Sequence, residues 1–205
     1  MRPRRHRAWV PGPSTSPLDG MKIAASLVIV GLGLGVNALF AAESTAVFTL
    51  PSGVAIRIVE APFDPAGHRV KGCGTSPVNR NAVVTCLIDG LPVFGSDSQL
   101  PDTYVKSITA SFKGRSYALD TSQMYNAWGK RPLEMKVKGV GTMRYFGGSC
   151  RDALNCILRG LFSDAAGSYI AEWQIIDGTA VRTALTDSGD IVGQLINHID
   201  PPVYE

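Results

Sequence analysis

Histidine is scarce in this sequence, and the familiar motifs of catalysis are missing. The 205 residues include three histidines, and only His68 and His198 lie beyond residue 42. Neither belongs to a G-x-S-x-G, H-E-x-x-H or H-x-E with C-x-x-C pattern, which are the usual signatures of serine hydrolases and zinc enzymes. His198 lies near the end of an expected helix, where a cation is favourable beside the helix dipole, and His68 lies in a Pro/Gly loop. We therefore predict a protein that is not an enzyme.

The acidic residues form no recognisable catalytic or metal-binding set. Glu172 stands beside Trp173, which would suit a carbohydrate site, but neighbouring side chains of a strand point to opposite faces, so a buried Trp173 predicts an exposed Glu172. No calcium-binding loop pattern occurs. We expect no metal ion and no other cofactor. The alternative is a small hydrolase or glycan-binding domain that uses Glu172 or the histidines.

A strong charge of one sign is also lacking. The chain has 20 Lys and Arg against 17 Asp and Glu, for a net charge of +3. Residues 1–42 hold five of the basic residues and one of the acidic ones, so the remainder holds 15 basic and 16 acidic residues. This balance gives no reason to expect a nucleic acid or another polyanion as partner.

One long apolar run is present, in residues 21–42. Lys22, an uninterrupted apolar stretch and then small residues are typical of a secretory signal peptide. Cleavage after Ala42 would leave residues 43–205 as one domain outside the cytoplasm, although Phe40 stands where the cleavage rule prefers a small residue. Residues 1–20, rich in Arg and Pro, are then an over-called start or a disordered leader.

Two other interpretations of this run remain open. Residues 23–40 are 18 residues long, the lower limit for an uncleaved membrane anchor, but three glycines and Asn37 disfavour a stable anchor. Residues 33–38 fit G-x-G-x-x-A, and Glu60 follows as a ribose-binding acid would. A dinucleotide-binding fold needs repeated alternation of strand and helix, which the rest of the chain lacks.

The four cysteines, Cys73, Cys86, Cys150 and Cys156, all follow residue 42. An even number in an exported domain favours two disulfides, for which three connectivities exist. We favour Cys73 with Cys86 and Cys150 with Cys156, because each pair closes a small loop at low entropic cost. A zinc site is the alternative, but its spacing would lack the usual C-x2-C pairs.

The remaining chain is typical of antiparallel β-sheet, because short β-branched segments alternate with turn residues. Three hairpins are expected, at 46–60, 104–119 and 169–185. The last is the clearest, since Asp177-Gly178 is a dipeptide typical of type I′ turns. Val105, Ile108 and Phe112 do not alternate, which indicates a bulge. Further strands are expected at 83–88, 141–146 and 157–162.

Helix is expected mainly at the C-terminal end. Asp187 or Ser188 can cap it, Ile191 to Ile199 supply an apolar stripe, and Pro201 stops it. A short helical turn is expected at 121–128, and Gly147 and Gly148 are interpreted as a bend that lets a disulfide close. The expected fold is mainly β (α+β): an antiparallel β-sandwich or curled half-barrel with one C-terminal helix.

One segment has the composition of a protein-binding surface. Residues 124–132 read MYNAWGKRP, in which aromatic residues alternate with Asn, Lys and Arg, as in interface hot spots. Tyr125, Trp128 and Arg131 are therefore the predicted partner-binding residues. Packing of Tyr125 and Trp128 in the core is the alternative.

Several strings of the chain resemble a known family. They are TYVKSITASFKGRSYALD, MYNAWGKRPLE, RYFGGSC, LFSDAAGSYIAEWQI and HIDPP. They look like a family of small exported proteins from Gram-negative bacteria, associated with immunity proteins encoded beside type VI secretion phospholipase effectors. The resemblance covers nearly all of residues 43–205. It implies a periplasmic inhibitor that binds and neutralises a phospholipase-like toxin, and it assigns no individual binding residue.

Overall fold

The structure is a computed structural model, and it describes residues 42–74, 85–127, 134–137, 141–163 and 165–201. These residues all belong to one compact unit, Leu39–Glu205. The expected leader and all but the last residue of the expected signal peptide lie outside them. Within the described part of the chain, no helix is both long and apolar enough to cross a bilayer.

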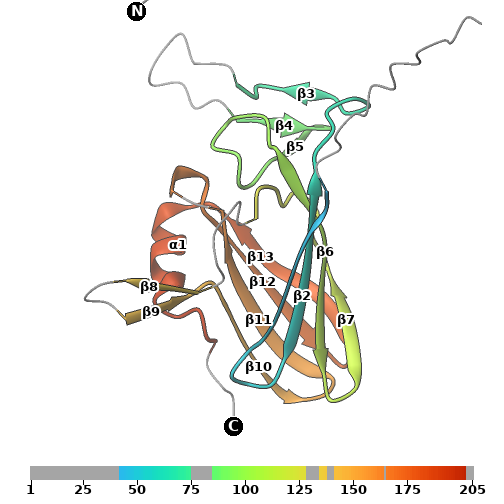
Figure 1. Ribbon diagram of the computed structural model, residues 1–205, viewed down its shortest axis with the longest axis vertical. Helices are drawn as coiled ribbons and strands as arrows, with labels where there is room; N and C mark the ends of the chain where they lie inside the picture. The colour runs from blue at the N-terminus through green and yellow to red at the C-terminus, as the bar shows by residue number, and fades with distance from the viewer. Residues whose placement is uncertain (1–41, 75–84, 128–133, 138–140, 164, 202–205) are drawn as a thin grey trace, which may run out of the picture. The chain divides into compact units, whose positions relative to one another are not determined.

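Strands dominate the described residues (Figure 1). The elements are β1 (Ser44–Thr49), β2 (Ala55–Pro62), β3 (Val70–Lys71), β4 (Leu87–Ile88), β5 (Leu91–Pro92), β6 (Thr103–Phe112), β7 (Arg115–Leu119), β8 (Glu134–Val137), β9 (Gly141–Arg144), β10 (Phe146–Asp152), β11 (Asn155–Phe162), a 3₁₀ turn (Ala165–Gly167), β12 (Tyr169–Ile176), β13 (Thr179–Thr186) and α1 (Gly189–Ile196).

Two four-stranded antiparallel sheets, β1-β2-β6-β7 and β10-β11-β12-β13, enclose one core. Apolar side chains alternate along the strands, so one face of each sheet is buried: Ile56 and Ile108 come from the first sheet, and Leu158 and Trp173 from the second, all of them with no exposed area. The sheets do not close into a barrel. The prediction of a mainly antiparallel β fold with one C-terminal helix is confirmed.

All three predicted hairpins form, around β1-β2, β6-β7 and β12-β13. The last two turn at Lys113-Gly114 and Asp177-Gly178, and all four residues have positive φ angles, between 46° and 82°. This is the backbone that a type I′ turn requires. The expected strand at 141–146 is instead split between β9 and β10, and the expected strand at 83–88 forms only at β4 among the described residues.

The predicted bulge is present in β6. Val59 of β2 is paired with Ser107 and Glu60 with Val105, so Lys106 has no counterpart. The extra residue brings Val105 and Ile108 to the same face although they are three positions apart. Both side chains are buried in the core.

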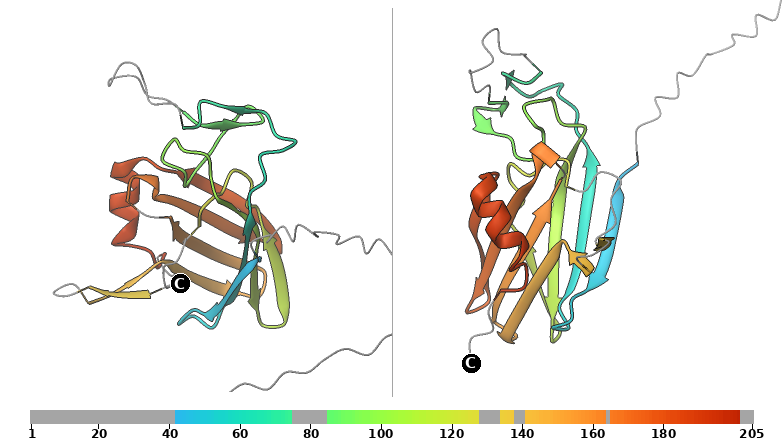
Figure 2. Two further views of the ribbon diagram at one scale, coloured as in Figure 1. Left: turned by 45° about the horizontal axis from the view of Figure 1, so that its top comes forward. Right: turned by 90° about the vertical axis from the view of Figure 1, so that its left-hand side faces the viewer.

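The C-terminal helix α1 covers part of the outer face of the second sheet (Figure 2). Its Val192, together with Ile199, packs on Leu161 and Ile170 in a second apolar cluster. Ser188 precedes the first helical residue as predicted but makes no side-chain capping bond.

Two local predictions are wrong. Residues 121–127 contain no helical turn, because Met124 and Tyr125 form β-bridges with Phe94 and Tyr104. The two glycines at 147 and 148 do not bend the chain but lie within β10.

The two glycines of β10 are explained by close packing on both faces of the strand. A Cβ atom at Gly147 would lie 2.3 Å from the carbonyl oxygen of Ile199, and one at Gly148 would lie 2.5 Å from Leu158 Cδ2. At Gly147 the obstacle is backbone, so β10 requires glycine there for the C-terminal segment to pack against it. At Gly148 the nearest atom is the end of a side chain, and the Ile157 carbonyl oxygen at 3.0 Å adds to the crowding against β11.

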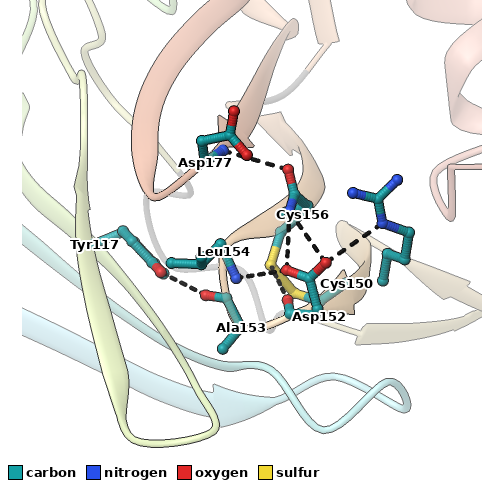
Figure 3. The surroundings of a disulfide bond; sticks show 9 residues. Tyr117, Cys150, Asp152, Ala153, Leu154, Cys156 and Asp177 are labelled. Atoms are coloured by element: carbon teal, nitrogen blue, oxygen red, sulfur yellow. Dashed lines mark hydrogen bonds and ion pairs between the residues drawn. A yellow bond between two sulfur atoms is a disulfide. The ribbon is translucent and has the colours of Figure 1, made fainter.

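The favoured disulfide pairing is confirmed: Cys73 is bonded to Cys86 and Cys150 to Cys156. Cys150 and Cys156 stand opposite each other in the β10-β11 hairpin. The turn between them is held by the Asp152 carboxylate, which accepts hydrogen bonds from the Leu154 N–H and the Asn155 side chain (Figure 3). Two disulfides indicate an oxidising location outside the cytoplasm.

Candidate partner-binding surface

Tyr125, the described member of the predicted contact set, lies half-buried at the surface. Its backbone N–H donates to the Phe94 carbonyl at 3.0 Å, and its carbonyl accepts the hydroxyl of buried Tyr169 at 3.1 Å. Its ring meets the Phe63 ring edge-to-face, with centroids 5.5 Å apart. Trp128 and Arg131 lie outside the described residues.

A buried carboxylate fixes the segment that carries Tyr125. Glu60, at the end of β2, is 7% exposed and accepts hydrogen bonds from the Thr103 hydroxyl and from the Ala127 N–H, the latter at 2.9 Å. The Asn126 amide oxygen accepts from the backbone N–H groups of Asp102 and Thr103. Glu60 therefore acts in the fold and not as a ribose-binding acid, and the backbone around Tyr125 is held from both sides.

Gly95 allows the chain to pass directly beneath Tyr125. Its φ angle is +97°, and a Cβ atom there would lie 2.1 Å from the Tyr125 carbonyl oxygen. Only glycine adopts this backbone without strain and leaves room for the neighbouring chain. The position of Tyr125 therefore depends on this residue.

His68 and Asp89 extend the surface next to the Phe63 ring. The imidazole Nδ1 and the Asp89 carboxylate are 2.7 Å apart, with 42% and 45% of the two side chains exposed. The His68 ring lies 5.2 Å from the Phe63 ring, centroid to centroid. We call Phe63, His68, Asp89 and Tyr125 the aromatic patch.

Asp89 is positioned by the turn between β4 and β5. It has a φ angle of 54° and precedes Gly90, and its carboxylate accepts the Arg69 N–H at 2.9 Å while its own N–H donates to the Arg69 carbonyl. These bonds join the turn to the start of β3. The Cys73–Cys86 disulfide links the far end of β3 to β4, so the small sheet β3-β4-β5 is tied at both ends.

The electrostatics of the patch follow from these contacts. The hydrogen bond from the Arg69 N–H, and then that from His68, lower the pKa of the Asp89 carboxyl below its usual value. Burial raises the pKa of the Tyr125 hydroxyl, and the nearby Asp89 charge raises it further. At neutral pH the patch therefore presents a neutral phenol beside an ionised carboxylate.

The small sheet also carries exposed apolar side chains. Val70 of β3 and Leu91 of β5 stand on either side of Ile88 in register and are 40% and 54% exposed. Aromatic and aliphatic groups next to a few fixed polar groups are the composition of protein-binding surfaces.

The other residues considered for catalysis serve the fold. Glu172 does point away from the core, opposite to Trp173, but it is not exposed as predicted: its side chain is 18% exposed and bonds Arg159. The Arg159 guanidinium also donates to the His198 carbonyl. The C-terminal segment thus covers the Arg159–Glu172 pair, and the bond from Arg159 joins this segment to the second sheet.

Two kinds of site would indicate catalysis or metal binding among the described residues: a nucleophile bonded to His68 and a cluster of metal ligands. Among these residues, no hydroxyl or thiol nucleophile bonds the free nitrogen of His68, and no group of three or more His, Cys, Asp or Glu side chains is placed to hold a metal ion. One surface depression, of about 240 Å³, lies beside β11 and β12, and its lining includes Ser149, Arg151, Asn155, Ile157, Gln174 and Ile176.

Comparisons of the chain with models of known protein families, with curated proteins and with solved structures found no match.

Proposed function

We propose that this protein is a periplasmic inhibitor of the immunity type, which binds and neutralises a secreted phospholipase-like toxin through the aromatic patch. The main observation in favour of this binding surface is the fixed position of Tyr125, whose backbone is hydrogen-bonded to Phe94 and to Tyr169. A rigid aromatic side chain loses little conformational entropy on binding and contributes a large contact area. The class of toxin rests on the resemblance of the sequence strings.

Export also supports the proposal. The two disulfides require an oxidising compartment, and the signal-like segment 21–42 would deliver the chain to the periplasm. An inhibitor that works there protects the cell from a toxin delivered to the same compartment. No catalytic group is needed for this role.

Co-purification tests the proposal. The mature chain 43–205, expressed with the phospholipase-like effector encoded beside its gene, should form a stable complex and suppress hydrolysis of phospholipid vesicles by that effector. Charge reversal at Arg131, one of the predicted contact residues, should weaken the complex. A chain that neither binds the effector nor slows its hydrolysis would overturn the proposal.

The hydrolase alternative is favoured by one observation, the His68–Asp89 pair, since a carboxylate that orients an imidazole is a common part of a general base. The His68→Ala variant distinguishes the hydrolase from the inhibitor. Loss of a hydrolytic activity of the chain itself in this variant would support the alternative. A chain without hydrolytic activity, whose toxin complex is weakened by this change because His68 belongs to the aromatic patch, supports the inhibitor.

A further inference from the structure

Strand β1 is the outermost strand of its sheet, whose order is β1-β2-β6-β7. In Figure 2 it is the blue strand at the border of the sheet. None of the other described strands pairs with its outer edge. Val47, in its centre, is 68% exposed, the highest value among the exposed large hydrophobic side chains of the described residues.

Backbone hydrogen-bonding groups face this free edge. The Leu50 N–H donates to the Val54 carbonyl and the Leu50 carbonyl accepts the Gly53 N–H, both at 2.8 Å, so the backbone groups of Leu50 point toward β2, next to the pair of Thr49 and Ala55. In an antiparallel ladder, residues whose N–H and C=O groups point toward the partner strand alternate with residues whose groups point away from it. The groups of Thr45, Val47 and Thr49 therefore point away from β2, toward the free edge.

The edge of β1 lacks the features by which natural edge strands avoid pairing with strands of other molecules. Residues 44–49 read STAVFT, without Lys, Pro, Gly or any charge, whereas natural edge strands usually carry one of these or are covered. By comparison, the edge strand β13 of the second sheet lies against β7. On the predicted cleavage after Ala42, a single residue precedes β1, so no preceding chain remains to cover its edge.

The side chains of β1 fit an antiparallel copy of themselves. Paired residues must lie on the same face of a sheet. A twofold axis through Val47 places Val47 opposite its own copy and Thr45 opposite Thr49, all on the solvent face. On the inner face it places Ala46 opposite Phe48. The solvent row is then made only of β-branched residues, which pair favourably across strands.

We propose that β1 pairs with β1 of a second copy of this chain, in antiparallel register with Val47 opposite Val47, so that the two first sheets form one continuous sheet of eight strands. The contact of two six-residue strands is smaller than a standard protein interface. The dimer is therefore weak, with a dissociation constant in the micromolar range or above.

Sedimentation equilibrium of the mature chain 43–205 tests the dimer, over roughly 1 µM to 1 mM so that a weak association is populated. The wild type should shift from monomer to dimer with concentration. Val47→Lys should weaken association at least tenfold, because it places two like charges opposite each other. Val181→Lys is the matched control: Val181 is 48% exposed on edge strand β13, and its change should leave association unaltered. A monomer throughout this range, or equal dimers in both variants, overturns the proposal.

Cysteine cross-linking tests the register. Cα atoms of opposed strand residues lie about 5.5 Å apart, within the range of a disulfide. Val47→Cys should therefore give covalent dimers on mild oxidation. Thr49→Cys alone should not, whereas a mixture of Thr45→Cys and Thr49→Cys chains should. Equal cross-linking of Thr49→Cys alone would contradict the register, and a dimer that Val47→Cys fails to trap would assign the association to another surface.

Discussion

The sandwich and the small sheet β3-β4-β5 are held together in different ways. The sandwich buries aromatic and aliphatic side chains between two four-stranded sheets, and Trp173 and Tyr169 have no exposed area. The small sheet has strands of two residues each, and both residues of β3 are exposed. Its order depends on a disulfide and on the Asp89 turn. A region that buries little apolar surface needs such cross-links, and its exposed side chains are free for binding.

The largest expected effect is on the sandwich. Trp173→Ala should lower the free energy of unfolding by about 3–5 kcal/mol, because it opens a cavity among Phe146 and Phe162 and removes the bond from the indole N–H to the Asp120 carbonyl. Chemical denaturation measures this. Ile176→Ala, on the same strand but 52% exposed, should stay within about 0.5 kcal/mol. A loss of similar size in both variants would mean that Trp173 is not part of the main core.

Removing each disulfide in turn should affect the sandwich and the small sheet differently. Replacing both cysteines of either pair with Ala should cost about 2–3 kcal/mol by the chain-entropy model, less for the shorter 150–156 loop. Hydrogen exchange should show that only the Cys73/Cys86 variant exposes the amides of Arg69 and Asp89, which join the turn to β3. Continued protection of these amides would show that the small sheet does not need its disulfide.

Gly95→Ala should disturb the aromatic patch at Tyr125, whose backbone packs directly on Gly95. The positive φ angle alone costs about 1–2 kcal/mol, and the overlap with the Tyr125 carbonyl adds to it. Gly114→Ala is the matched control, since Gly114 also has a positive φ angle but a Cβ atom there meets nothing within 4 Å. Unfolding free energies and the NMR shifts of the Tyr125 ring measure both effects. Equal losses in the two variants would remove the steric part of the argument.

The smallest expected effect is the loss of the Asp89 hydrogen bonds, and with it of local stability in the small sheet, at low pH. Because the folded pKa of Asp89 is lowered from 3.8, its bonds stabilise the fold above that value and are lost as the pH falls through the lower, folded pKa. The protection factor of the Arg69 amide, which corrects for the intrinsic pH dependence of exchange, should therefore fall as the pH drops through the folded pKa of Asp89. Asp89→Asn should remove most of this change in protection. A protection factor that does not change with pH in the wild type would contradict the role of the carboxylate.

Local signals in the sequence predicted most of the fold. Asp177-Gly178 sets a hairpin because its neighbours in sequence are also its neighbours in space, and Cys150 and Cys156 pair across a hairpin for the same reason. The bulge at Lys106 also followed from a local break in alternation.

The candidate site was predicted only in part because distant residues build it. Asp89 meets His68 across 21 positions, and Glu60 reaches the Ala127 amide across 67. No local pattern predicts such contacts. The orientation of Glu172 was predicted correctly, but its burial depends on Arg159 and on the C-terminal segment, which strand alternation does not include.

Calorimetric binding of the Tyr125→Ala variant to the toxin tests the central claim most directly. If the aromatic patch binds the toxin, affinity should fall by about 2 kcal/mol, roughly thirtyfold, while Ile176→Ala binds like the wild type. Thermal melting of the free variant shows whether the fold is kept. The account predicts a folded Tyr125→Ala protein with this loss of affinity. A folded variant with unchanged affinity would contradict it.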